Sequence, residues 1–129
     1  MTDEDRLREG LTVRRAVLGD EHVDRAEARK TALTADFQNF ITRYAWGEIW
    51  ARPGLSRHTR SLITISMLLA LNRPEELQMH FKAAFNNGVT AEELKEVILH
   101  CGLYCGLPAA NSAYHLLEDV LKVQGDMRE

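Results

Sequence analysis

The sequence predicts an all-α protein: a single domain of about six helices formed by 129 residues. Strand signals are missing, because the chain has no sustained alternation of apolar and polar residues and few clusters of β-branched side chains. Apolar residues instead recur at helical spacing, in segments separated by glycine or proline. The stretch Thr90-Ala91-Glu92-Glu93 also has the pattern of a helix capping box.

Residues 1–30 are interpreted as an N-terminal helical arm. A helix is expected from Asp3 to Leu18, where apolar residues lie among charges, and Gly19 is a suitable stop. The segment from Asp20 to Lys30 is highly charged and weakly apolar, so it forms either a short exposed helix or a loose arm.

A further helix is expected to begin at Thr34 or Asp36, since either side chain can cap it. The stretch from Trp46-Gly47-Glu48 to Arg52-Pro53-Gly54 then predicts a break into a turn or short helices. Between these points, the residues at core spacing are Phe37, Phe40, Ile41 and Tyr44.

Ser56 can cap a helix that runs to about Leu71, and residues 62–71 are apolar around nearly the whole helix circumference. A helix that is apolar all round is expected to be buried on all sides. A domain of this size has difficulty covering such a helix, so the sequence favours a partner subunit.

The remaining helix boundaries follow from proline, glycine and capping signals. Pro74 suits a first helical turn, where its missing N–H would be unpaired anyway, and Gly88 ends that helix. Gly106 and Pro108 separate the helix that opens at Thr90 from a last one reaching about Val123. The inward-facing residues of the helix after Thr90 are expected to be Leu94, Val97, Ile98 and Leu99.

Composition excludes several functions. The net charge is −3 with neutral histidines, so there is no basic surface for nucleic acid or an anionic membrane. The longest apolar run, residues 62–71, is much shorter than the about 20 residues that span a bilayer. No signal peptide is visible, and two cysteines suggest reduced thiols rather than a disulfide framework. These features predict a cytoplasmic protein.

Three groups of polar residues are candidates for chemistry. Arg73, Glu76 and His80 are spaced by three and four residues, so they share one helix face. A histidine titrates near neutral pH and can transfer a proton, and a nearby carboxylate can orient it. The alternative is a surface Arg–Glu pair beside a structural histidine, with acidic residues suiting the helix N-terminus.

The second group is Trp46, Glu48, Trp50 and Arg52. Two aromatic rings can wall a pocket, and a guanidinium can hold a carboxylate through two hydrogen bonds. The alternative is a packed turn with an ion pair at its rim.

The third group is His100 and Tyr104, which share a helix face and can donate hydrogen bonds into a cavity or be satisfied within the core. A cluster at a helix start can supply cationic charge or form solvated surface: Arg57, His58 and Arg60.

The tract from Arg43 to Asn111 resembles the γ-carboxymuconolactone decarboxylases, most specifically at WGEIWARPGLSRHTRSLIT, LNRPEELQMH and GLPAANSA. These enzymes belong to a larger all-helical family that includes the alkylhydroperoxidase D-like proteins. The resemblance implies an alkylhydroperoxidase D-like fold, one carboxymuconolactone decarboxylase domain over residues 1–129, and a homohexamer built as a trimer of dimers. It implies cofactor-independent decarboxylation, in protocatechuate catabolism, of a small lactone dicarboxylate substrate.

The resemblance also suggests roles for the candidate residues. His80 is expected to donate the proton, while Glu48 or Glu76 orients or re-protonates it. The residues expected to bind substrate are Arg52 with help from Arg60 for a carboxylate, Tyr104 or His100 for the lactone oxygen, and Trp46 and Trp50 for excluding water. No cofactor and no metal is expected.

Cys101 and Cys105 are separated by C-x-x-x-C, which differs from the redox C-x-x-C pattern and from standard metal-ligand spacings. In the family's peroxidases a Glu, a C-x-x-C and a later His form the motif, and the two Cys positions fall here at Arg73 and Glu76. Only His80 matches, since Ser61 replaces the Glu. Both cysteines are therefore expected to be small core residues. The alternatives are a thiol-dependent hydroperoxide reductase using these cysteines and a non-catalytic helical binding protein.

Overall fold

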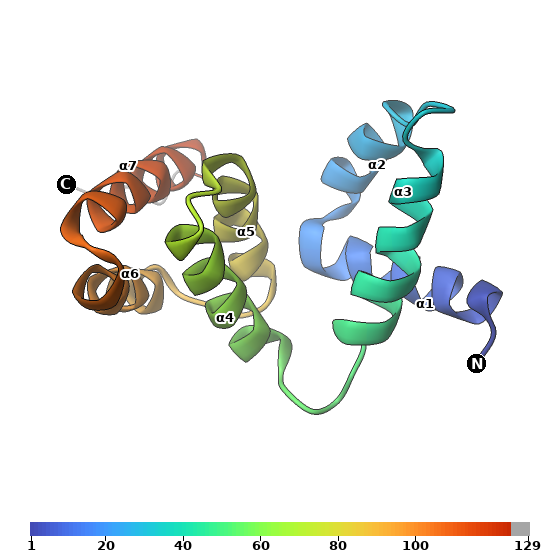
Figure 1. The fold of residues 1–129 in the computed structure, drawn as a ribbon, viewed down its shortest axis with the longest axis horizontal. Coiled ribbons are helices and arrows are strands. Elements are labelled where there is room, and N and C mark those ends of the chain that lie inside the picture. Colours follow the sequence, from blue (N-terminus) through green and yellow to red (C-terminus); the bar gives the residue numbers. More distant parts are fainter. Residues whose placement is uncertain (125–129) are drawn as a thin grey trace. The chain divides into compact units, whose positions relative to one another are not determined.

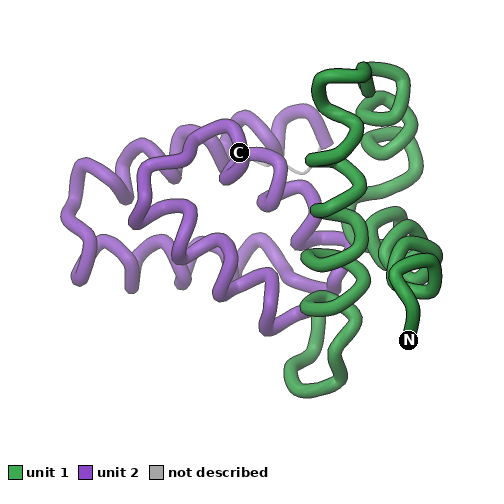
Figure 2. Tube along the Cα trace, turned by 45° about the vertical axis from the view of Figure 1, so that its right-hand side comes forward, with its two compact units in different colours: residues 1–57 green, residues 58–129 purple. Residues whose placement is uncertain are grey.

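The computed structural model describes residues 1–124, which form helices and contain no strand, so the predicted all-α class is confirmed. The chain divides into two compact units after Arg57 (Figure 2). The assignment of residues 1–129 to one domain stays a prediction. Figure 1 labels the α-helices, and the elements in chain order are α1 (Asp3–Leu18), α2 (Asp20–Ala28), α3 (Ala35–Phe40), the π-helix η1 (Ile41–Ile49), α4 (Arg57–Ala70), α5 (Pro74–Asn86), α6 (Ala91–Cys105) and α7 (Leu107–Val123).

Helix α1 has the bounds that the sequence predicts. A capping box closes its start: the Asp5 N–H donates to Thr2 Oγ1 at 3.1 Å and the Thr2 N–H donates to Asp5 Oδ2 at 2.9 Å. Gly19 ends the helix with a φ of 91°, a backbone conformation that residues with a side chain rarely adopt. The charged segment after it is a helix, α2, rather than a loose arm.

The predicted break over Trp46-Gly47-Glu48 to Arg52-Pro53-Gly54 is wrong for its first half and confirmed for residues 50–54. The helix that begins as α3 continues through these residues as η1, and the Trp50 N–H donates to the Ala45 carbonyl at 2.9 Å in the π pattern. Gly47 lies within the helix, at the place where η1 approaches α1 closely. A Cβ at this position would overlap the Arg6 carbonyl oxygen, so only glycine fits there. The irregular turn begins only after Ile49.

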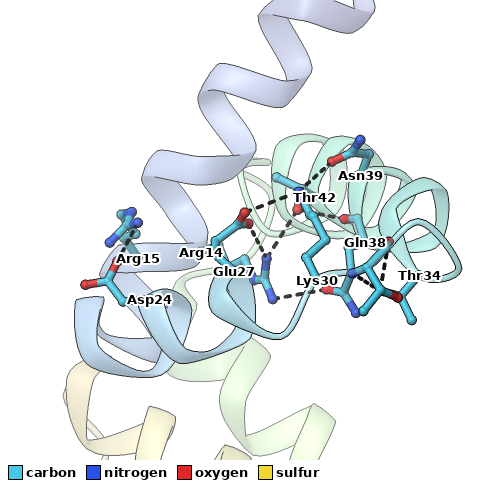
Figure 3. Close-up of polar contacts among 10 residues, drawn as sticks. Arg14, Arg15, Asp24, Glu27, Lys30, Thr34, Gln38, Asn39 and Thr42 are labelled. Carbon is cyan, nitrogen blue, oxygen red and sulfur yellow. Dashed lines mark hydrogen bonds and ion pairs between the residues drawn. The ribbon is translucent and has the colours of Figure 1, made fainter.

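A buried arginine ties the elements of the first unit together (Figure 3). The Arg14 guanidinium donates to Gln38 Oε1 at 3.3 Å and to Thr42 Oγ1 at 3.5 Å, and lies 3.8 Å from a Glu27 carboxylate oxygen. Burial lowers the pKa of Arg14, and the charge of Glu27 opposes that shift. Arg14 therefore links α1 to α2, α3 and η1.

Phe37 and Phe40 were expected in the core, and this prediction is wrong. Their exposed fractions are 63% and 54%. The side of this helix that meets α1 carries Thr42 and Gly47 instead, because only small residues allow the two backbones to approach so closely.

The second unit contains α4 to α7 around one hydrophobic core. Pro74 lies in the first turn of α5, Thr90 and Glu93 form the predicted capping box of α6, and Gly106 separates α6 from α7 with a φ of 103°. These predicted boundaries are confirmed. The largest core side chains of the four helices are Ile65, Leu69, Leu77, Phe81, Leu94, Ile98, Leu117 and Val120, and Val89, from the connection between α5 and α6, packs with them.

The expectation that α4 is buried on all sides is wrong for the single chain. Ile65 and Leu69 are buried, whereas the exposed fractions of Ile63, Met67 and Leu71 are 41%, 52% and 62%. Residues four apart lie on one face of a helix, and only that face of α4 packs into the core. Leu99 of α6, also expected to face inward, is 61% exposed for the same reason.

Candidate functional site

The end of η1 and the turn after it bring the Trp/Glu/Arg group together. The Trp46 and Trp50 ring centroids lie 5.2 Å apart, with the rings tilted by 32°, and Trp46 is buried. Arg52 Nη1 lies 3.7 Å from Glu48 Oε1, four residues earlier in the chain. The end of η1 and the turn after it thus contain two aromatic rings in contact and an exposed guanidinium paired with a carboxylate.

Arg6 of α1 joins this group, although the sequence reasoning missed it. Its Nε donates to Glu48 Oε2 at 3.3 Å. That hydrogen bond is the main reason why the pKa of Arg6 is raised. The two residues are 42 positions apart, so no spacing rule connects them in the sequence.

His80 lies on the buried side of α5. Its exposed fraction is 8%, and its helix neighbours Leu77 and Phe81 belong to the hydrophobic core. Glu76, one turn earlier, is exposed near the positive helix N-terminus, and Arg73 immediately precedes the helix. The expectation that all three share one helix face is therefore wrong for Arg73, which lies outside the helix, while His80 is shielded from water and Glu76 is accessible.

His100 and Tyr104 lie one turn apart on α6, with ring centroids 5.3 Å apart. His100 lines an open groove of about 610 Å³ between α4 and α6, together with Ser66, Glu96, Val97, Leu99, Cys101 and Leu103. Tyr104 is 76% exposed and is not among the groove's lining residues. His100 thus faces this groove.

The other cations predicted near the site lie at the start of α4. Arg60 is half-buried there. His58 Nε2 lies 2.8 Å from Glu93 Oε2, which joins the beginnings of α4 and α6. His58 is therefore part of a contact between helices, rather than a solvated surface residue.

The cysteines are free thiols in different surroundings. Cys101 is buried in the core, as predicted, whereas Cys105 is exposed at the end of α6, so its predicted core position is wrong. Ser61, which replaces the peroxidase glutamate, is fully buried and accepts a hydrogen bond from Asn87 Nδ2 at 2.8 Å. The position thus has a structural hydroxyl where the peroxidase motif has a carboxylate.

No three His, Cys, Asp or Glu side chains among residues 1–124 come together as metal ligands. None of the helices in the same range has the length and apolar content needed to cross a membrane. The Trp/Glu/Arg group belongs to the first unit, and the candidates on α4, α5 and α6 belong to the second.

The described residues form an all-helical protein with a buried histidine on α5 and with charged residues at the two positions where the peroxidase motif has cysteines. Comparison with known families identifies its family. The chain belongs to the carboxymuconolactone decarboxylase family, whose model matches residues 35–119, from the first residue of α3 into α7.

Individual relatives extend the similarity to α1 and α2. The chain is 60% identical over 125 residues to a 4-carboxymuconolactone decarboxylase of Acinetobacter baylyi, covering 97% of this chain and 93% of that protein. It is 40% identical over 121 residues to a nitrosuccinic acid decarboxylase of Metarhizium robertsii, covering 94% and 85%. A 4-carboxymuconolactone decarboxylase sequence of Pseudomonas putida is 46% identical over 48 residues, which are 37% of this chain and 100% of that sequence.

Proposed function

We propose that this protein decarboxylates 4-carboxymuconolactone to the 3-oxoadipate enol-lactone and carbon dioxide, a step of protocatechuate catabolism in the β-ketoadipate pathway. The observation that carries the proposal is the 60% identity to a decarboxylase of that name over nearly the full length of both chains. The WGEIWARPGLSRHTRSLIT and LNRPEELQMH stretches, which contain most candidate site residues, support the same reaction.

The substrate supplies the electron sink for this reaction. Its leaving carboxylate is attached to a ring carbon that is conjugated through a double bond to the lactone carbonyl. When carbon dioxide leaves, the electron pair of the broken bond moves through the double bond into the carbonyl and forms a dienolate. A proton then adds to the ring carbon next to the carbonyl and gives the enol-lactone. No metal or organic cofactor is therefore required.

The protein must then provide a proton donor and stabilise negative charge. His80 is the proposed donor, because a histidine transfers protons near neutral pH and this one is shielded from water. Glu48 or Glu76 orients or re-protonates His80. His100 or Tyr104 donates a hydrogen bond to the lactone oxygen.

Cations bind the carboxylate that does not react. Arg52 is the proposed anchor, since its guanidinium is exposed in the turn that follows η1, and Arg60 assists. The leaving carboxylate must be bound less tightly, because interactions that are equally strong in substrate and transition state lower no barrier. The two tryptophans exclude water from the reacting ring.

We further propose that the chain assembles as a homohexamer, a trimer of dimers, in the cytoplasm. Support comes from apolar side chains that the single chain leaves exposed on its second unit. The exposed fractions of Leu99, Leu103 and Leu107 are 61%, 75% and 77%. Single exposed apolar residues are common, but three large ones spaced four apart in the chain are typical of an interaction surface. Burying this surface against further copies of the chain would stabilise the assembly.

The test is a spectrophotometric assay of lactone consumption with purified protein, with and without exhaustive chelation. Turnover that survives chelation is expected. A folded protein that binds the lactone without consuming it would instead be a helical binding protein. Reduction of a hydroperoxide by dithiol would favour the thiol-dependent reductase.

Nitrosuccinate is the second candidate substrate, because a relative with 40% identity is named for its decarboxylation. Like the lactone, it has two carboxylates and an electron-withdrawing group that can take up the released electron pair. Assaying both substrates with the same preparation decides between them, and a higher kcat/KM for the lactone is expected.

A further inference from the structure

The Glu48 carboxylate is shared between two guanidinium groups from different parts of the first unit. Its Oε2 accepts a hydrogen bond from Arg6 Nε at 3.3 Å, and its Oε1 lies 3.7 Å from Arg52 Nη1. Each oxygen thus has its own cationic partner. The pair with Arg6 has hydrogen-bond geometry, whereas the longer one with Arg52 is an ion pair only.

Arg6 has further partners besides Glu48. Besides Glu48, its guanidinium lies 3.3 Å from Asp3 Oδ1 and 5.6 Å from the centre of the Tyr44 ring. The Tyr44 hydroxyl in turn donates to Asp3 Oδ1 at 2.9 Å, which closes a ring of contacts between α1 and η1. The Arg6 side chain is 26% exposed and that of Arg52 is 59% exposed.

The backbone keeps Arg6 close to Glu48. Gly47, the residue before Glu48, approaches α1 so closely that a Cβ on it would overlap the carbonyl oxygen of Arg6. One residue of α1 therefore meets Gly47 through its backbone and Glu48 through its side chain. This double contact fixes the position of the carboxylate relative to α1.

We propose that Arg6 is a positioning residue that holds Glu48 and thereby keeps Arg52 available for a carboxylate of the substrate. This inference rests on the proposed function, in which Arg52 anchors the substrate. Without Arg6, the nearest cation to Glu48 is Arg52, and the two would close into a tighter pair that competes with substrate. The carboxylate would also repel a doubly negative ligand, since its charge would lose one of its two balancing cations.

Asp3 is the other anion that faces Arg6, and it competes with Glu48 for the Arg6 charge only in part. Its side chain is 63% exposed, so solvent and salt screen its charge more than that of Glu48, which is 39% exposed. Asp3 is also bound by the Tyr44 hydroxyl. The Arg6 charge is therefore directed mainly at Glu48.

The test compares steady-state kinetics of the Arg6→Gln protein with wild type. We expect KM for the lactone to rise about 3–10-fold, the range for losing a partly exposed charge-assisted contact, with kcat changing less than about 3-fold. Arg6→Lys keeps a cation opposite Glu48, so it should recover part of the loss, and it serves as the test protein if Arg6→Gln fails to fold. Arg8→Gln is the matched control, because Arg8 lies on the same helix and its ion pair is with Asp5 of that helix.

A double-mutant cycle shows whether Arg6 acts through Glu48. In a Glu48→Gln background, Arg6→Gln should raise KM by less than about 2-fold, because the group it positions is gone. The inference is overturned if Arg6→Gln and Glu48→Gln raise KM by factors that multiply independently. It is also overturned if Arg6→Gln has the same KM as Arg8→Gln. If Arg52→Gln raises KM and Arg6→Gln does not, only this inference fails. Absence of lactone turnover in wild type overturns the proposed function, and the inference with it.

Discussion

Gly10 of α1 and Gly47 of η1 bring two helix backbones into direct contact. A Cβ on Gly10 would overlap the carbonyl oxygen of Thr42 and lie 3.2 Å from the Gly47 nitrogen. A Cβ on Gly47 would overlap the carbonyl oxygen of Arg6. Both clashes involve backbone atoms, which cannot rotate away as a flexible side chain can. The pair therefore sets the distance at which Arg6 meets Glu48.

Replacing Gly47 by alanine should destabilise the protein. Alanine favours an isolated helix by about 1 kcal/mol over glycine, but here its methyl group must push α1 away, and overpacking typically costs about 1–3 kcal/mol. We expect a net loss of unfolding free energy in chemical denaturation, together with a higher KM because Arg6 and Glu48 separate.

Gly54→Ala is the matched control for this change. A Cβ on Gly54 would meet no atom within 4 Å, so its effect should stay within about 0.5 kcal/mol. Equal stability of the two alanine variants would show that the close helix contact does not constrain η1.

The sequence predicted the boundaries of most helices because these depend on local chemistry. Gly19, Pro74 and the Thr90–Glu93 capping box act within one turn of their own helix, and all three lie where they were expected. Gly47, which was expected to help break the helix, instead lies in close contact with a residue far away in the chain, Arg6. Rules based on neighbouring residues cannot detect such a contact.

Burial was predicted less well than helix boundaries. Phe37 and Leu99 have core spacing but are exposed, because periodicity shows that a helix has an apolar face and not whether this chain covers it. In the candidate site, likewise, contacts between neighbours in the chain were predicted and a contact between distant residues was not. Trp46 with Trp50 and Glu48 with Arg52 are four residues apart and were predicted as one group, whereas Arg6 was missed.

Stability below neutral pH should depend on Glu93. The hydrogen bond from the Thr90 backbone N–H, assisted by His58 and the Thr90 hydroxyl, lowers the pKa of Glu93 below its ordinary value of 4.5. A lowered folded-state pKa stabilises the protein above the unfolded value, and this contribution is lost as the pH falls through the folded-state pKa. Glu93→Gln should therefore be less stable than wild type at neutral pH, with the difference shrinking below about pH 4.5.

Thermal unfolding of both proteins between pH 7 and pH 3 measures this difference. Glu92→Gln is the control, because Glu92 is an exposed neighbour whose ion pair is with Lys95 in the same helix. A difference in Tm between wild type and Glu93→Gln that stays constant from pH 7 to pH 3 would contradict the proposed link between Glu93 protonation and stability.

The thiols should be dispensable for turnover. We expect the Cys101→Ala, Cys105→Ala double variant to keep most of its decarboxylase activity, because the proposed reaction uses no sulfur. Cys101 is buried, so its loss should lower the unfolding free energy by about 1 kcal/mol, whereas the exposed Cys105 should contribute little. A double variant that folds but cannot consume the lactone would return the thiol-dependent reductase to consideration.

Assembly should depend on the apolar surface of α6 and the start of α7. Replacing Leu103 by glutamate places a charge among exposed leucines, and burying that charge between copies would cost several kcal/mol. Light scattering should therefore show an oligomer for wild type and a smaller species for Leu103→Glu. Leu33→Glu is the control, since Leu33 is 91% exposed in the turn between α2 and α3. A wild-type protein that is monomeric at micromolar concentration would overturn the proposed hexamer.

His80→Asn tests the proposed proton donor directly. Asparagine is polar and of similar reach but cannot donate a proton near neutral pH. General acid catalysis typically contributes about 10²–10⁴-fold, so kcat should fall by roughly that factor while KM changes much less. A donor must be protonated to act, so the wild-type rate should fall at high pH, and this dependence should disappear in the variant. His115→Asn, at an exposed position of α7, should behave like wild type. If His80→Asn folds, assembles and consumes the lactone within a few-fold of wild type, the donor is another residue, and Glu48 and Glu76 become the candidates.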